Sequence, residues 1–305
     1  MHPLRLLPLW AFLPLRWAVA RLRRRNPLRA AAILVLRQAR QATTGTLSRR
    51  LSSVVPLDHP DLSFEPVDSM VMDAVFWMGL RGYEGKVADI WVELCRDARS
   101  VLEIGGNVGL FTVIGARAGS AAYVVVEPVP SLTGTLRRNL ARNGVEHVTI
   151  LTAAAIPGAL AGPVVLSIPG DSRGAPVDAF LADLSEVTDR DRSHSITVPG
   201  IPIAELVQGH DLIKIDAEGV EAELIEAVRG WLVRTRPTLM IEVLPESERL
   251  GRLLARLAIA AGYEIIVIPE WGSDDPVTID PARFDSTVPA RHNSKDVLLR
   301  VPRPG

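Results

Sequence analysis

VLEIGGNVGL, residues 101–110, is the stretch that decides the expected fold of this chain. It begins as a short apolar run, breaks into a glycine-rich turn and continues into an apolar, helix-compatible segment at 110–118. A strand, a glycine-rich turn and a helix in this order are typical of nucleotide pockets in parallel α/β sheets. Glycine allows a positive φ and a close approach to a ligand, and the start of the helix offers unpaired N–H groups.

The spacing within this turn separates two kinds of pocket. A dinucleotide fingerprint requires G-x-G-x-x-G, whereas this chain reads Glu103-x-Gly105-x-Asn107-x-Gly109, with Asn107 in place of the middle glycine. The pattern is similar to the first motif of the class I S-adenosylmethionine methyltransferases. Taken alone, the stretch is also compatible with a purely structural strand-to-helix turn.

Strands and helices alternate along the rest of the chain. The apolar runs predict strands at 100–104, 122–126, 148–151, 212–215, 238–243, 263–268 and 296–301, and a hairpin with arms at 163–168 and 195–198. Leu132, Leu136 and Leu140 mark a helix that Ser131 could cap, and a leucine-rich helix at 250–257 ends at Gly262. The alternation predicts a parallel or mixed α/β sheet with helices on both faces.

Composition limits the classes of function. The chain has 305 residues, 48% of them hydrophobic and 23% charged, enough for one large or two small domains. A formal net charge of -1 does not favour binding to nucleic acid. Cys95 is the single cysteine, which excludes a disulfide framework and a cysteine-based metal site within one chain.

Residues 1–57 differ from the remainder. They contain eleven arginines but no lysine and no acidic residue, together with Trp10, Phe12 and Trp17. Arg5 and Arg16 interrupt the best apolar run, so it falls short of the ~18 residues that a spanning helix needs. We predict an arginine-rich apolar extension at 1–57, with its best helix at 30–41, and a second domain at 58–305. The extension either lies on anionic membrane or packs on its own domain. We expect a cytoplasmic protein, which is membrane-peripheral in the first of these cases.

Three segments together resemble the FkbM family of methyltransferases. They are VLEIGGNVGLFT at 101–112, VEPVP at 126–130 with Asn139 and Asn143 downstream, and LIKIDAEGVE at 212–221. The resemblance covers roughly residues 79–301. It implies a Rossmann-like class I methyltransferase sheet and S-adenosylmethionine as cofactor. It also implies O-methylation of a hydroxyl on a sugar, a glycolipid, or a glycosylated or polyketide metabolite.

The resemblance also implies which residues form the cofactor pocket. Glu127 would hold the ribose, because a carboxylate at the end of the second strand accepts two hydrogen bonds. Asp216 would face the cofactor amine and the acceptor. Small residues after strand 148–151 would leave room for a flat base, although they equally suit a simple strand end. The expected pocket consists of Glu84, Glu103, Gly105, Gly106, Asn107, Gly109, Phe111, Glu127, Pro128, Ala154, Ala155 and Asp216, with Gly105, Asn107 and Gly109 at the methionine end.

Transfer of a methyl group to a hydroxyl requires alignment and removal of a proton. Orientation contributes ~7–11 kcal/mol and a positioned base ~10²–10⁴-fold. Asp216 and Glu218 are the candidate bases. Alternatively, Asp216 acts in cofactor binding alone, and Glu218 is a structural residue that is stabilised at a helix N-terminus and has no catalytic role. His194 and His292 are alternatives that equally suit ordinary loops. We predict no metal site, because Asp216 and Glu218 have no clear third ligand. The polar stretch 170–192 is expected to select the acceptor.

Two other classes of function remain open from the sequence. A nicotinamide-dependent oxidoreductase would share the acid after the second strand, but the spacing of the glycine-rich turn does not favour it. A non-enzymatic membrane-peripheral scaffold would explain the extension but not the preserved pocket residues. Calorimetry with S-adenosylmethionine and with a nicotinamide dinucleotide distinguishes the methyltransferase from the oxidoreductase, since only the methyltransferase should bind S-adenosylmethionine.

Overall fold

The structure is a computed structural model that describes residues 51–56, 58–80, 84–119, 122–168, 180–181, 194–269 and 275–302. Residues 1–50, including the predicted helix at 30–41, and most of the predicted acceptor loop at 170–192 lie outside these ranges. Within the described ranges, no helix is both long and apolar enough to span a membrane.

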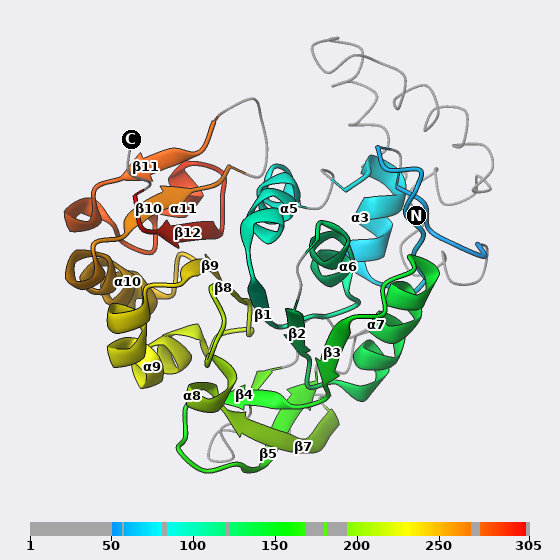
Figure 1. The fold of residues 1–305 in the computed structure, drawn as a ribbon, viewed down its shortest axis with the longest axis horizontal. Helices are drawn as coiled ribbons and strands as arrows, with labels where there is room; N and C mark the ends of the chain where they lie inside the picture. The colour runs from blue at the N-terminus through cyan, green and yellow to red at the C-terminus, as the bar shows by residue number, and fades with distance from the viewer. Residues whose placement is uncertain are drawn as a thin grey trace, which may run out of the picture.

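An eight-stranded sheet forms the centre of the molecule (Figure 1). Its parallel part runs β3-β2-β1-β8-β9, and β12 lies antiparallel between β9 and β10, with β11 at the edge. The strands are β1 (Ser100–Ile104), β2 (Ala122–Val126), β3 (Val148–Leu151), β8 (Leu212–Ile215), β9 (Thr238–Glu242), β10 (Glu264–Val267), β11 (Val277–Ile279) and β12 (Asp296–Arg300). The predicted α/β sheet is confirmed, and β11 is an addition that the sequence analysis did not predict.

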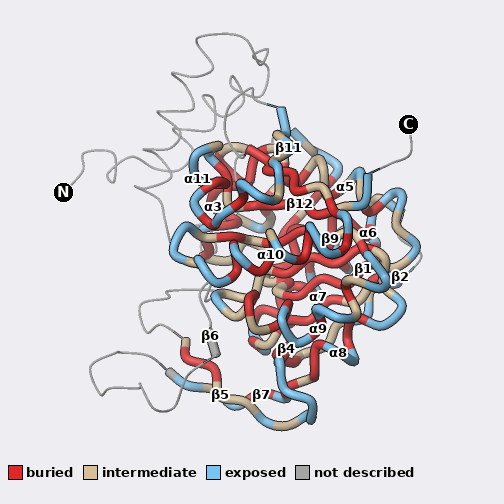
Figure 2. Tube along the Cα trace, turned by 90° about the vertical axis from the view of Figure 1, so that its left-hand side faces the viewer, coloured by how far each residue is buried: buried red, intermediate tan, exposed pale blue. Residues whose placement is uncertain are grey.

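Helices cover both faces of this sheet, and Figure 1 shows the two groups apart. One apolar core joins the sheet to α3 (Met70–Met78), α5 (Val87–Asp97), α6 (Leu110–Arg117) and α7 (Pro130–Arg142). A second core joins it to α8 (Ile203–Leu206), α9 (Glu221–Thr235) and α10 (Glu248–Ala261). Figure 2 shows that the buried segments gather around central strands such as β1, β9 and β12.

Side-chain alternation assigns each strand residue to one core. Within β1, Val101 belongs to the α5–α7 core, whereas Leu102 and Ile104 belong to the α8–α10 core. Successive side chains of a strand point to opposite faces. Glu103 therefore faces the same side as Val101, under α5 and α6.

A second, smaller sheet was only partly predicted. The expected hairpin is confirmed as β5 (Gly162–Ile168) paired antiparallel with β7 (His194–Pro202). The sheet also contains β6 (Phe180–Leu181) and β4 (Ala154–Ile156), which pairs parallel with β7. Ala154 and Ala155, which suited either room for a flat base or a simple end of β3, thus begin a separate strand.

The start of α7 corrects another expectation. Ser131 does not cap this helix; Val129 is the N-cap and Pro130 is the first helical residue. Proline suits this position because its fixed φ is already helical and its missing N–H would have no partner there. At the other end of the domain, Gly262 ends α10 in the left-handed conformation as expected.

The packed part of the chain includes residues before the predicted domain start at 58. Val54 and Phe64 exchange two backbone hydrogen bonds of 2.8 Å. Both side chains are buried in the core that contains α3. The segment at 51–56 therefore packs with the domain that follows it.

The short helices η4 (Pro281–Arg283) and α11 (Val288–Arg291) precede β12.

Candidate active site

A cavity of about 370 Å³ opens at the carboxyl ends of β1 and β8. The chain leaves β1 toward β2 on one side and later returns as β8 on the other, and such a switch point is where α/β sheets bind ligands. Both candidate catalytic residues, Asp216 and Glu218, line the cavity. So do eleven of the twelve expected pocket residues: Glu84, Glu103, Gly105, Gly106, Asn107, Phe111, Glu127, Pro128, Ala154, Ala155 and Asp216.

Gly105 brings β1 and β8 into close contact. Its φ is +87°, and a Cβ atom at this position would lie 1.8 Å from the backbone oxygen of Asp216. The Gly105 N–H donates to Val126 O at 2.9 Å, and the Asp216 N–H donates to Ile104 O at 3.0 Å. The turn therefore ties the ends of β1, β2 and β8 together, and no larger residue fits.

Gly109, the remaining expected residue, does not line the cavity. It is the N-cap of α6 with φ +86°, and a Cβ there would lie 2.9 Å from Leu136 Cγ. Its small size lets the start of α6 pack against α7. The structure thus gives Gly109 a packing role beneath the glycine-rich turn.

Glu127 is held by two backbone N–H groups. Its Oε2 accepts from Asn107 at 2.8 Å and its Oε1 accepts from Val129 at 2.9 Å. Burial raises the pKa of Glu127 to about 7, against the lowering effect of these hydrogen bonds. Each carboxylate oxygen still has acceptor capacity, so Glu127 can receive further donors from the cavity.

Asn107 occupies the left-handed region at φ 47°. Its own Oδ1 accepts from the Val108 N–H at 2.7 Å, which stabilises this conformation locally. The geometry places the backbone of Asn107 beside Glu127, the residue that the resemblance assigns to the ribose.

Glu103 lies at the base of the cavity. Its Oε2 accepts from Tyr123 OH at 2.6 Å and from Thr112 Oγ1 at 2.8 Å. Burial raises its pKa to about 7, although Lys214 opposes the shift. Lys214 pairs with Glu103 in the β1–β8 register, so the two side chains share a face of the sheet.

Lys214 fixes the charge of Asp216. Its Nζ donates to Asp216 Oδ2 at 2.8 Å and lies 4.9 Å from the centre of the Phe111 ring. Burial opposes ionisation of Asp216, but Lys214 and Lys295 outweigh it and hold the Asp216 pKa below its usual value. Asp216 is therefore an ionised carboxylate at neutral pH.

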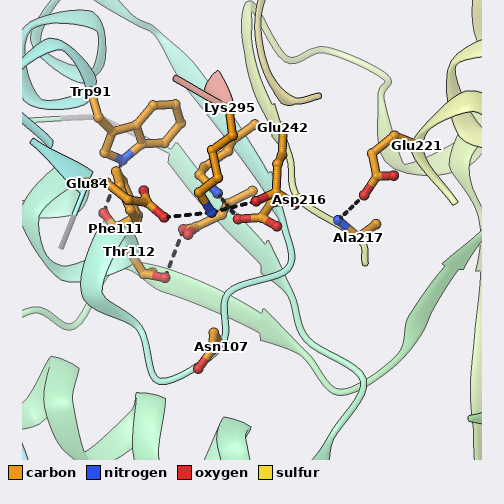
Figure 3. A network of polar contacts seen from close by, with 12 residues as sticks. Glu84, Trp91, Asn107, Phe111, Thr112, Asp216, Ala217, Glu221, Glu242 and Lys295 are labelled. Carbon is orange, nitrogen blue, oxygen red and sulfur yellow. Dashed lines mark hydrogen bonds and ion pairs between the residues drawn. The ribbon is translucent and has the colours of Figure 1, made fainter. Parts of the chain in front are cut away.

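Lys295 connects two more carboxyl groups (Figure 3). Its Nζ donates to Glu242 Oε1 at 2.5 Å and lies 3.3 Å from Glu84 Oε1. Burial and the charge of Asp216 raise the pKa of Glu242 to about 7. Burial likewise raises the pKa of Glu84, whose Oε2 is buried and has no hydrogen-bond partner within the described ranges.

Lys214, Glu242 and Lys295 line the cavity although the sequence analysis did not select them. The sequence did contain one indication that two of them are functional: Lys214 and Glu242 are ionisable residues inside or at the end of otherwise apolar strands. Lysine is also rare in this chain, which has three lysines among 34 basic residues, and two of the three line this cavity.

Two acidic residues, Glu218 and Glu221, lie between the end of β8 and the start of α9. The Glu221 carboxylate accepts from the N–H groups of Ala217 at 2.8 Å and Gly219 at 3.1 Å, and α9 begins at Glu221. Glu221 thus stabilises the start of α9. Glu218 lines the cavity at φ 52°, a conformation that costs energy outside glycine and is often kept at functional sites.

His194 and His292 were the other candidate bases. His292 does not line this cavity, and the side chain of His194 is outside the described part of the chain. Across the same described part, no three His, Cys, Asp or Glu side chains are grouped to hold a metal ion.

Sequence comparison identifies the family. The sequence model of the methyltransferase FkbM domain matches residues 103–265. The chain belongs to the FkbM methyltransferase family. This match includes the glycine-rich turn, Glu127 and Asp216, and it identifies the chain as an S-adenosylmethionine-dependent methyltransferase.

Comparison with solved structures matches several methyltransferases at low identity and low TM-score. An FkbM methyltransferase from Methylobacillus flagellatus KT is 15% identical, with a TM-score of 0.38, over 88% of this chain and 60% of that one. An O-methyltransferase from Bacillus cereus in complex with SAH is 14% identical, with a TM-score of 0.37, over 70% and 80%. An SAH-bound methyltransferase from Podospora anserina is 12% identical, with a TM-score of 0.35, over 71% and 78%. The chain thus spans less than two thirds of the Methylobacillus structure, and no curated protein matches its sequence.

Proposed function

We propose that this FkbM methyltransferase methylates oxygen, on a hydroxyl of a sugar, a glycolipid, or a glycosylated or polyketide metabolite. The observation that supports oxygen as the target is the group of carboxyl side chains Asp216, Glu218 and Glu242 at the carboxyl ends of β8 and β9. A neutral amine attacks without losing a proton first, whereas a hydroxyl needs a base to remove its proton.

Residues on one side of the cavity suit the nucleoside part of S-adenosylmethionine. Glu127 has acceptor capacity for ribose hydroxyls, and its position is fixed by the Asn107 and Val129 N–H groups. Ala154 and Ala155 line the same cavity with side chains small enough to leave room for adenine. When bound, the cofactor supplies a methyl group that is already activated on a positively charged sulfur.

Asp216 is the group that we assign to the acceptor hydroxyl and the nearby cofactor cation. Lys214 keeps it ionised and fixes its Oδ2, and the tie between Gly105 and Asp216 fixes its backbone. Burial and the charge of Asp216 raise the pKa of Glu242 to about 7, so near neutral pH Glu242 holds the proton and Asp216 stays ionised. Glu218 is the second candidate that can contact the hydroxyl. Orientation by these fixed groups is the larger contribution, and removal of the proton adds to it.

The test is product analysis with an isotopically labelled methyl donor. Purified full-length protein is incubated with deuterium-labelled S-adenosylmethionine and with glycan, glycolipid and polyketide fractions. Mass spectrometry then locates the label. A labelled methyl ether on a hydroxyl is expected, and Asp216→Asn should abolish it. Label found on nitrogen or sulfur alone would contradict the proposal.

The extension at 1–57 supports a location of the acceptor near a membrane. Eleven arginines with no acidic residue are attracted to anionic lipid by about 1 kcal/mol each near the surface. We propose that this attraction brings the catalytic domain of a cytoplasmic, peripheral protein close to a glycolipid acceptor.

A further inference from the structure

Glu84 has an unsatisfied oxygen at the cavity. The residue is 3% exposed and lies three positions before Val87, the first residue of α5. One carboxylate oxygen, Oε1, lies 3.3 Å from Lys295 Nζ, whereas Oε2 is buried and has no hydrogen-bond partner among the residues that the structure describes. A buried carboxylate oxygen without a donor is costly. A ligand that brings a donor into the cavity would remove this cost.

Lys295 has a donor to spare beside this oxygen. An ammonium group has three N–H donors, and the contacts with Glu84 and Glu242 account for two of them. The Lys295 side chain remains 30% exposed and lines the cavity. Its third N–H is therefore available to a ligand oxygen.

The two groups together match a zwitterion. An unsatisfied acceptor and a spare cationic donor belong to side chains that lie 3.3 Å apart. An α-amino acid likewise carries its ammonium and its carboxylate on one carbon atom. We propose that Glu84 and Lys295 bind the amino-acid end of the cofactor, with Glu84 Oε2 accepting from the α-ammonium and Lys295 Nζ donating to the α-carboxylate.

The layout of the cavity agrees with this orientation. Glu127, bonded to Asn107, marks the side assigned to the ribose. Figure 3 shows Asn107 well separated from the cluster of Glu84, Lys295 and Glu242. The elongated cofactor can therefore extend from Glu127 to Lys295 and pass Asp216 with its reactive sulfur. The proposal concerns the cofactor and does not depend on which acceptor is methylated.

Calorimetry with two ligands tests the proposal on the full-length protein. S-adenosylhomocysteine has the amino-acid end, and 5′-methylthioadenosine lacks it. Lys295→Met should weaken S-adenosylhomocysteine by about 10–100-fold, the range for one lost hydrogen bond to a charged group. It should leave the affinity for 5′-methylthioadenosine within about twofold, because that ligand does not reach residue 295.

Two further variants complete the design. Glu84→Gln should show the same selective loss, since it removes the charge that receives the ammonium. Lys86→Met is the matched control: Lys86 pairs with Asp275 and does not line the cavity, so neither affinity should change. Equal weakening of both ligands by Lys295→Met, or no change in either, would overturn the assignment.

If Lys295→Met does not fold, a change in the ligand tests the same contact in the wild-type protein. Decarboxylated S-adenosylhomocysteine lacks only the group that Lys295 is proposed to bind. Wild-type protein should bind it about tenfold or more weakly than S-adenosylhomocysteine. Equal affinity of the two ligands would show that Lys295 does not contact the carboxylate, whatever the outcome of the product analysis that tests O-methylation.

Discussion

Replacing Gly105 with alanine tests the contact that joins the cofactor turn to β8. The added Cβ would lie 1.8 Å from Asp216 O, and this neighbour is backbone that cannot rotate away. The residue also has φ +87°, which costs an L-residue ~1–2 kcal/mol. Overpacking adds ~1–3 kcal/mol. We therefore expect Gly105→Ala to lower the free energy of unfolding by about 2–5 kcal/mol.

Gly144 provides a control that separates these two costs. It also has a positive φ, +66°, but a Cβ there would meet no atom within 4 Å. Gly144→Ala should therefore show the backbone cost alone, ~1–2 kcal/mol. Urea unfolding monitored by tryptophan fluorescence measures both variants, and calorimetry with S-adenosylhomocysteine should show weaker binding for Gly105→Ala alone. Equal destabilisation by the two variants, with cofactor binding intact, would refute the close contact between Gly105 and Asp216.

Four other predictions address separate parts of the molecule. Glu127→Ala should weaken S-adenosylhomocysteine by ~1.5–3 kcal/mol in calorimetry, the range for hydrogen bonds to a charged group; an unchanged dissociation constant in a folded variant would remove Glu127 from the ribose site. Asp216→Asn, nearly isosteric, should lower turnover far more than the melting temperature, and full activity would exclude Asp216 from the mechanism. Burial raises the pKa of Glu103 from 4.5 to about 7, so its contribution to stability is complete below pH 4.5 and is lost as the pH rises through 7. Glu103→Gln should therefore reduce the fall in unfolding free energy between pH 5 and pH 8 measured in urea, and an unchanged pH dependence would contradict the raised pKa. Deletion of residues 1–50, which keeps the buried Val54, should abolish salt-sensitive co-sedimentation with anionic vesicles; equal binding by both forms would favour an extension that packs on the domain.

The strands of the main sheet were predictable because their burial leaves a direct mark in the sequence. A parallel strand that is covered on both faces is apolar at nearly every position, as in β8 and in most of β1. Glycine marks the ends just as clearly, since Gly105 and Gly262 have positive φ values that other residues rarely adopt. The glycine-rich turn and the acid after β2 then located the cavity, because consecutive strands deliver their ends to one edge of the sheet.

The ionic contacts of the cavity could not be derived in the same way. Lys295 and Glu84 are separated by more than two hundred residues, and they meet because β12 inserts antiparallel beside β9. Local patterns do not specify that insertion or its register. The edge strand β4 was missed for a related reason, since three small or apolar residues, Ala154–Ile156, become a strand only by pairing with β7.

The charges around the cavity favour the methylated form of the cofactor over its product. Its lining contains six carboxyl residues and two lysines: Glu84, Glu103, Glu127, Asp216, Glu218 and Glu242, with Lys214 and Lys295. S-adenosylmethionine has one more positive charge than S-adenosylhomocysteine, because transfer of the methyl group turns the sulfonium into a neutral thioether. Buried carboxylates attract the sulfonium more strongly than carboxylates in water do, because the effective dielectric constant around them is lower. Burial holds the pKa values of Glu103, Glu127 and Glu242 near 7, so these groups can take up protons when the positive charge leaves. We therefore expect these carboxyl groups to attract the product less than the donor, which would favour its release.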